Sequence, residues 1–143
     1  MRRWTLLACA VLTLVAAACG GDAGTSSATS ATPTTPAARP ASPAKLSIIS
    51  PTNGQIVHGT TVQLDVSLKD AKIVAATTTN IVPDEGHLHV ILDDQLITMT
   101  GNTTQLIADL TPGQHLLKVE FVASDHAPFD PRVIAAVAFE VKA

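Results

Sequence analysis

Aromatic residues are nearly absent from this sequence. Among 143 residues there are three phenylalanines, one tryptophan and no tyrosine. Trp4 lies close to the N-terminus, so the rest of the chain has only Phe121, Phe129 and Phe139 as aromatic side chains. A hydrophobic core must therefore be mainly aliphatic, and binding of sugar rings by aromatic stacking is disfavoured.

Cysteine is also scarce, because Cys9 and Cys19 are the only two and both precede residue 20. The remaining chain therefore has neither an internal disulfide nor a cysteine nucleophile. Serine-hydrolase (GxSxG), zinc-protease (HExxH) and phosphate-binding glycine-loop motifs are absent as well. We expect a protein that is not an enzyme.

Basic residues are too few to form a patch. The chain has nine Lys and Arg residues against twelve Asp and Glu. Removal of an N-terminal segment that contains Arg2 and Arg3 would leave seven against twelve, a net charge of −5 with histidine neutral. Nucleic acid and anionic lipid headgroups are therefore not expected as partners.

The N-terminus has the layout of a secretory signal. Met1-Arg2-Arg3 is a short positive segment, residues 4–15 form a nearly uninterrupted apolar run, and three alanines precede Cys19. The apolar run is short for a transmembrane helix. The ending LVAAAC, followed by two glycines, resembles a bacterial lipobox, in which the cysteine is diacylated and becomes the mature N-terminus.

We therefore expect residues 1–18 to be a lipoprotein signal peptide and Cys19 to be the lipidation site, carrying acyl chains such as palmitate. The alternative is an ordinary signal peptide cut near Ala18, with Cys19 left as a free thiol. Several acyl chains hold a protein on a membrane far more firmly than one, since each buried methylene contributes about 0.8 kcal/mol. The expected location is the extracytoplasmic face of the cell membrane, with an envelope protein as a further partner.

A low-complexity segment follows the cysteine. Residues 20–44 contain only Gly, Ala, Ser, Thr and Pro apart from Asp22 and Arg39. Such a composition cannot bury enough apolar surface to offset the entropy of ordering. We expect residues 19–44 to be a disordered tether, and residues 45–143 to form one domain.

The predicted domain alternates apolar and polar residues with a period of two, as half-buried strands do. This pattern is clear over residues 62–68, 88–92, 117–121 and 137–141, and Gly/Pro/Asn/Asp turn signals separate the runs. About seven short strands in roughly a hundred residues predict an all-β fold. We expect an immunoglobulin-like antiparallel β-sandwich.

Histidine is the residue type that points to a site. In the stretch DEGHLHVILDD, His87 and His89 lie on one face of a predicted strand, about 6.6–6.8 Å apart along it. If Leu88, Val90 and Leu92 face the core, the two imidazoles face outward. Two imidazoles so placed can converge on one zinc or copper ion, although a closed site needs further ligands.

Three further histidines stand in different contexts. His115 occupies the position at which many immunoglobulin-like domains place a corner tyrosine, which favours a structural role. His126 lies in the predicted loop ASDHAPFDP, either as a polar loop cap or as a ligand. His58, in QIVHGTT, is expected to be a solvated turn residue.

Taken together, the motifs GHLHVILD, PGQHLL and DHAP resemble a family of small bacterial exported domains of uncharacterised function. In this chain that family pattern reads GHxHxxxD, PGxHxL and DHxP, and it extends over most of residues 51–141. Leu88 stands where members often have a third histidine. The resemblance implies an immunoglobulin-like fold and an exported location, and it brings no activity with it.

Two functions are compatible with these observations. The first is a lipid-anchored cell-envelope protein whose domain is a non-catalytic binding or structural module. The second is a histidine-based domain that binds or handles Cu(II) or zinc, with His87, His89 and His126 as ligands and Asp93 or His115 as a fourth ligand or supporting group.

Two further expectations bear on the metal. Met99 is the only methionine after the signal segment, and it lies ten residues from His89 in the sequence. A Cu(I) site is therefore not expected. A redox enzyme built on the same histidines is a third, weaker alternative, because a fold does not determine a function.

Overall fold

The computed structural model describes residues 38–74 and 80–143. The expected signal peptide, Cys19 and the tether as far as residue 37 lie outside these residues. No helix in the described part of the chain is long and apolar enough to cross a membrane.

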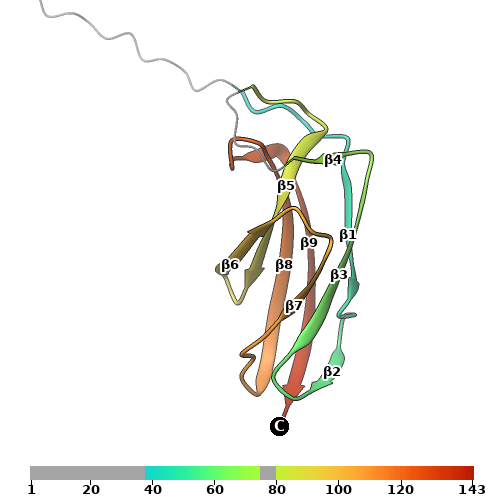
Figure 1. Cartoon of the computed structure of the whole chain (residues 1–143), viewed down its shortest axis with the longest axis vertical. Coiled ribbons are helices and arrows are strands. Elements are labelled where there is room, and N and C mark those ends of the chain that lie inside the picture. The colour runs from blue at the N-terminus through green and yellow to red at the C-terminus, as the bar shows by residue number, and fades with distance from the viewer. Residues whose placement is uncertain (1–37, 75–79) are drawn as a thin grey trace, which may run out of the picture. The chain divides into compact units, whose positions relative to one another are not determined.

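Nine strands in two sheets make up the described fold (Figure 1). The smaller sheet has the order β1-β3-β7, formed by Lys45–Ser50, Val62–Lys69 and Thr104–Ile107. The larger sheet has the order β2-β9-β8-β5-β4, with β6 also paired to β5. Its strands are Gln55–His58 (β2), Pro128–Lys142 (β9), Gly113–Ala123 (β8), Glu85–Leu92 (β5), Lys72–Ile73 (β4) and Gln95–Thr100 (β6).

The strand order is that of an immunoglobulin-like β-sandwich, as the sequence predicts. The first, third and seventh strands form one sheet, and the last two long strands, β8 and β9, pair in the other beside β5. All pairings are antiparallel except two short ones, β2 with β9 and β4 with β5. The expectation of an antiparallel sandwich is confirmed with these two exceptions.

Pro51 explains why the N-terminal strand is divided into β1 and β2, which belong to different sheets. Proline has no backbone N–H for a strand ladder, and Pro51 is buried between β1 and β2. A turn from Thr52 to Gln55 follows, with Gly54 at a positive φ of 77°. β1 therefore pairs with β3 in the small sheet, and β2 pairs with β9 in the large one.

The core between the sheets is aliphatic with three phenylalanines, as the composition requires. Leu88, Val90, Leu117, Val119 and Phe121 are fully buried on the inner face of the large sheet. Val62, Leu64 and Val66 meet them from β3. Burial of a large aliphatic or aromatic side chain contributes about 1.5–3 kcal/mol, so the alternating pattern fixes which face of each strand is buried.

Candidate metal-binding site

The central position of β5 fixes the first two histidines. β5 pairs with β8 along one edge and with β4 and β6 along the other. Because Leu88 and Val90 point into the core, His87 and His89 point to the outer face of the large sheet, as the alternation predicts. His87 lies at the point where the neighbouring strand changes from β4, which ends opposite Gly86, to β6, whose last residue, Thr100, pairs with Leu88.

The loop between β8 and β9 brings a third histidine over this face. His126 lies within this tight loop and has a positive φ of 64°. Its backbone N–H donates to the Ala123 carbonyl at 3.0 Å, and the Ala123 N–H donates to the Ala127 carbonyl at 3.1 Å. A left-handed conformation is uncommon for a residue with a side chain, and here it directs the imidazole back onto β5.

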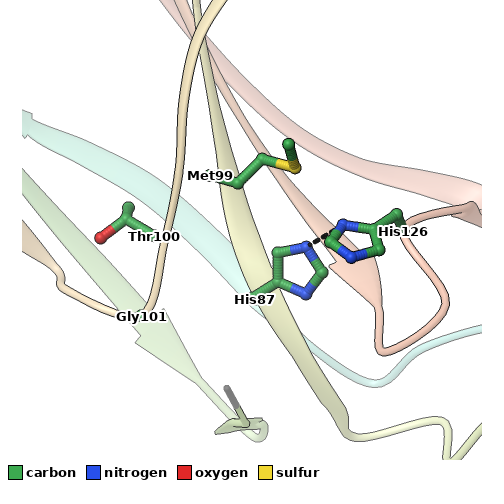
Figure 2. Close-up of a pocket in the computed structure, with 5 residues that line it drawn as sticks. All are labelled: His87, Met99, Thr100, Gly101 and His126. Atoms are coloured by element: carbon green, nitrogen blue, oxygen red, sulfur yellow. Dashed lines mark hydrogen bonds between the residues drawn. The ribbon is translucent and has the colours of Figure 1, made fainter. Parts of the chain in front are cut away.

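The three imidazoles converge. His87 Nε2 lies 3.2 Å from His89 Nε2 and 2.9 Å from His126 Nδ1. One ring nitrogen from each residue lies within 4.8 Å of the other two. Figure 2 shows the His87 and His126 rings side by side, with a dashed line for the contact between their nitrogens. Nitrogen ligands of a tetrahedral ion, at about 2.0–2.1 Å from the metal, lie ~3.3 Å apart, so the two separations from His87 are close to those around a shared ion, and the same distances also suit hydrogen bonds between imidazoles.

The surroundings of His87 and His89 favour their neutral forms. His87 is 8% exposed, His89 is half-buried and His126 is exposed. Burial, followed by the proximity of His126 and His89, lowers the pKa of His87 to about 4. Burial and His126 also lower the pKa of His89, against an opposing effect of Glu120. Neutral imidazole is the form that binds metals.

Gly86 allows β5 to approach β8 beside the site. A Cβ atom on Gly86 would lie 1.9 Å from the carbonyl oxygen of Val122, which is the residue paired with His87. A side chain at this position would therefore push the two strands apart. This close approach is the physical reason for glycine in the GHxH motif.

An ion pair from the segment before β1 holds the histidine loop. Arg39 Nη1 donates to Asp125 Oδ2 at 2.7 Å, and Nη2 donates to Asp125 Oδ1 at 3.0 Å and to the Ala127 carbonyl at 3.0 Å. Arg39 Nε donates to the Pro128 carbonyl at 2.9 Å. The last residues of the expected tether thus contact the domain, a role that the low-complexity composition of residues 20–44 conceals.

A buried carboxylate lies next to His89 on the adjacent strand. Glu120 is the residue paired with His89 and is only 3% exposed. Arg132 covers it, since its Nε donates to Glu120 Oε1 at 2.6 Å and a terminal nitrogen donates to Oε2. The alternation over residues 117–121 places Glu120 on the outer face, but it does not reveal that Arg132, which follows a register shift between β8 and β9, bonds to it.

A pocket of about 260 Å³ opens beside the histidines and contains a methionine. It is lined by His87, His126, Met99, Thr100 and Gly101 (Figure 2). Met99 on β6 is the residue paired with His89 on β5. The expectation that no methionine lies near the histidines is therefore wrong. Ten residues of chain separate His89 from Met99, but the turn between β5 and β6 folds them back side by side.

Asp93 and His115 do not join this cluster. His115 Nδ1 contacts Asp93 Oδ2 at 2.7 Å, and His115 Nε2 contacts the Thr111 carbonyl at 2.7 Å. His115 is seven residues along β8 from Val122, the partner of His87, which is about 24 Å at 3.4 Å per residue. Neither residue is placed to act as the fourth ligand or the supporting group that the sequence analysis considered.

His115 instead has the structural role of a corner residue. Its ring is buried, stacks on Phe139 at a centroid distance of 5.5 Å and joins two turns by hydrogen bonds. Carboxylate and carbonyl oxygens only accept hydrogen bonds, so the two contacts together favour the protonated imidazole, in which both ring nitrogens donate. The bond to the Thr111 carbonyl and the Asp93 carboxylate raise the pKa of His115, against the opposing effect of burial.

Comparisons with known proteins add the following. No protein-family model and no curated protein matches this chain. A fibronectin(III)-like module of Clostridium thermocellum CbhA is similar in structure, with a TM-score of 0.49 and 20% identity over 68% of this chain and 94% of that one. The PKD domain of human KIAA0319 has a TM-score of 0.43 and 18% identity over 85% and 92% of the two chains. The strand order identifies the fold, and the distances between the histidines define the candidate site.

Proposed function

We propose that this protein is a cell-envelope metal-binding module that holds one copper or zinc ion through His87, His89 and His126. The single observation that carries the proposal is the convergence of three imidazole nitrogens, from β5 and the β8–β9 loop, at separations of 2.9 and 3.2 Å along the cluster. Three imidazoles are a ligand set typical of zinc and copper sites.

Three features of the surroundings support a binding role. His87 and His89 belong to a strand that is paired on both edges, so their spacing is rigid. The β8–β9 loop is held by the Arg39–Asp125 ion pair, so His126 is fixed in advance of binding. His126 is exposed, which leaves a route for the ion to enter from solvent.

We further propose that the module is not catalytic and is anchored to the membrane through Cys19. The signal-like N-terminus and lipobox-like ending support this location. Acyl chains on Cys19 would keep the metal site at the extracytoplasmic surface, at a distance set by the low-complexity segment.

Metal titration of the full chain tests the proposal. The protein is purified in detergent with Cys9→Ser and Cys19→Ser replacements, so that no thiol competes for the metal. It is titrated by calorimetry with Zn(II) and Cu(II), and anaerobically with Cu(I) against a chromophoric chelator. We expect one equivalent of at least one of these ions to bind with micromolar or tighter affinity.

Variants identify the ligands. His87→Ala and His126→Ala are expected to weaken binding at least a hundredfold, while His58→Ala, a change at an exposed histidine on β2, leaves it unchanged. The contrary outcome is that no ion binds, and that His87→Ala only lowers the thermal stability. The histidine contacts would then be structural, since neutral imidazoles can also hydrogen-bond to one another.

A further inference from the structure

The side chain of Met99 is exposed on the sheet face that carries the histidines, and it does not belong to the hydrophobic core. It is 53% exposed, whereas the core of the sandwich consists of aliphatic residues and three phenylalanines. It is the only methionine after the signal-like N-terminal segment. Other apolar residues of β6, Leu96 and Ile97, are exposed too, so what sets Met99 apart is its place at the pocket of the histidines.

The strand register places Met99 against the imidazoles. Met99 and His89 are paired residues of β6 and β5, and paired residues of adjacent strands have Cβ atoms about 4.5–5.5 Å apart on the same face. Met99 lines one pocket with His87 and His126. Figure 2 shows the Met99 side chain beside the His87 and His126 rings at this pocket.

The charges around the pocket distinguish between ions. The cluster of the three histidines includes no carboxylate within the described residues. Both oxygens of Glu120 are bonded to Arg132, and both oxygens of Asp125 are bonded to Arg39. The remaining donors, three imidazoles and a thioether, carry no negative charge.

A monovalent ion fits such a neutral, partly buried ligand set better than a divalent one. With no carboxylate in the cluster, an ion of charge +2 would depend on solvent or an anion to offset its charge beside His87, which is buried, whereas an ion of charge +1 needs less compensation. Thioether sulfur is also a soft ligand, and soft ligands select Cu(I) over zinc. A cuprous ion satisfies both conditions.

From these observations we propose that Met99 supplies the fourth ligand of the histidine cluster and that the site binds Cu(I) in preference to Zn(II). This inference rests on the proposed function, because it takes the three histidines as ligands. It identifies a specific ion, an additional ligand on β6 and an oxidation state that the sequence alone does not suggest.

The experiment compares Met99→Leu with the parent protein in the same cysteine-free, detergent-purified full chain. Leucine has nearly the same volume but no sulfur, so folding is expected to be unchanged. We expect Met99→Leu to weaken Cu(I) binding at least tenfold and to change Zn(II) binding less than threefold. Leu96→Ala, at an exposed residue of the same strand outside the pocket, is the matched control and leaves both affinities unchanged.

A spectroscopic measurement separates ligation from a structural effect. X-ray absorption at the copper edge is expected to show nitrogen scatterers with one sulfur scatterer in the parent protein, and nitrogen scatterers alone in Met99→Leu. Cu(I) binding that depends on His87 but is the same in Met99→Leu, or a preference for Zn(II), overturns this inference and leaves the proposed function intact. If no ion binds in a His87-dependent manner, both proposals fail.

Discussion

Arg39 and Asp125, which lie 86 residues apart in the sequence, form a two-pronged ion pair with N–O distances of 2.7 and 3.0 Å. The same arginine also donates to the carbonyls of Ala127 and Pro128. His126 lies between these partners along the chain. The segment that precedes β1 therefore determines where the third imidazole of the candidate site is held.

Arg39→Ala is expected to weaken metal binding by about tenfold without removing a ligand, because residues that orient metal ligands typically contribute 10–100-fold in affinity. Calorimetric titration of the cysteine-free full chain measures this. Lys45→Ala is the matched control, since it removes another ion pair close to the N-terminal end of the domain, with Asp70, but on the exposed edge of β1. Equal affinities of Arg39→Ala and the parent protein would show that the loop holds His126 by its own backbone contacts.

Gly86→Ala is expected to lower the free energy of unfolding by about 1–3 kcal/mol, the usual cost of overpacking a tight contact. The added Cβ would lie 1.9 Å from a backbone oxygen of β8, which cannot move without shifting the strand. Urea denaturation followed by circular dichroism measures the change. Because His87 is the next residue, metal affinity is expected to fall as well.

The matched control is Gly101→Ala, where the nearest atom to a new Cβ is a methyl group of Ile73 at 3.2 Å. A side-chain methyl can adjust, so the loss of stability is expected to be smaller there. If Gly86→Ala were as stable as Gly101→Ala, the strand approach at Gly86 would not be the reason for glycine in the motif.

His115→Phe is expected to destabilise the domain by about 1–3 kcal/mol, because it keeps the ring that stacks on Phe139 but removes two hydrogen bonds of a charged group. The effect should depend on pH. The pKa of His115 is raised in the folded state, so its stabilising contribution is complete below the unfolded pKa near 6.5 and decreases as the pH rises through the folded pKa.

Asp93 sets the lower limit of the pH range in which the contact between His115 and Asp93 stabilises the domain. Burial tends to raise its pKa, but the Leu116 N–H and His115 hold it below the ordinary value of 3.8. Its contribution is therefore present above that value and is lost as the pH falls through the lower folded pKa. The difference in unfolding free energy between parent and His115→Phe, measured in urea at several pH values, should be largest between about pH 4 and 6.5 and should shrink as the pH rises through the raised folded pKa of His115. A difference that grows with pH would contradict a protonated His115.

Cys19→Ser is expected to abolish lipidation. In cells of a bacterium that processes lipoproteins, the parent protein should enter the detergent phase on Triton X-114 partitioning and accumulate as an uncleaved precursor in the presence of globomycin. The serine variant should show no globomycin-sensitive cleavage. Cys9→Ser is the control, and processing of this variant should be normal. Cleavage of Cys19→Ser at the same site would instead support an ordinary signal peptide.

The sequence by itself determined the class of fold and the faces of the strands. Leu88, Val90, Leu117 and Val119 alternate with polar residues, and because side chains on a strand point to opposite faces in turn, this alternation assigns His87 and His89 to the outer face. The corner role of His115 was also accessible, because its position after a Pro-Gly turn is a local feature. These results depend only on neighbours in the chain.

The composition of the site was decided by the tertiary structure. His126 was a candidate ligand from the sequence, but only the conformation of its loop places it beside His87. Met99 joins through a strand pairing whose register the sequence pattern does not reveal. Asp93, in contrast, follows the histidine strand directly but turns to His115. Alternation specifies the face on which a side chain lies, whereas distances between strands depend on register and loop conformation, and metal coordination depends on those distances.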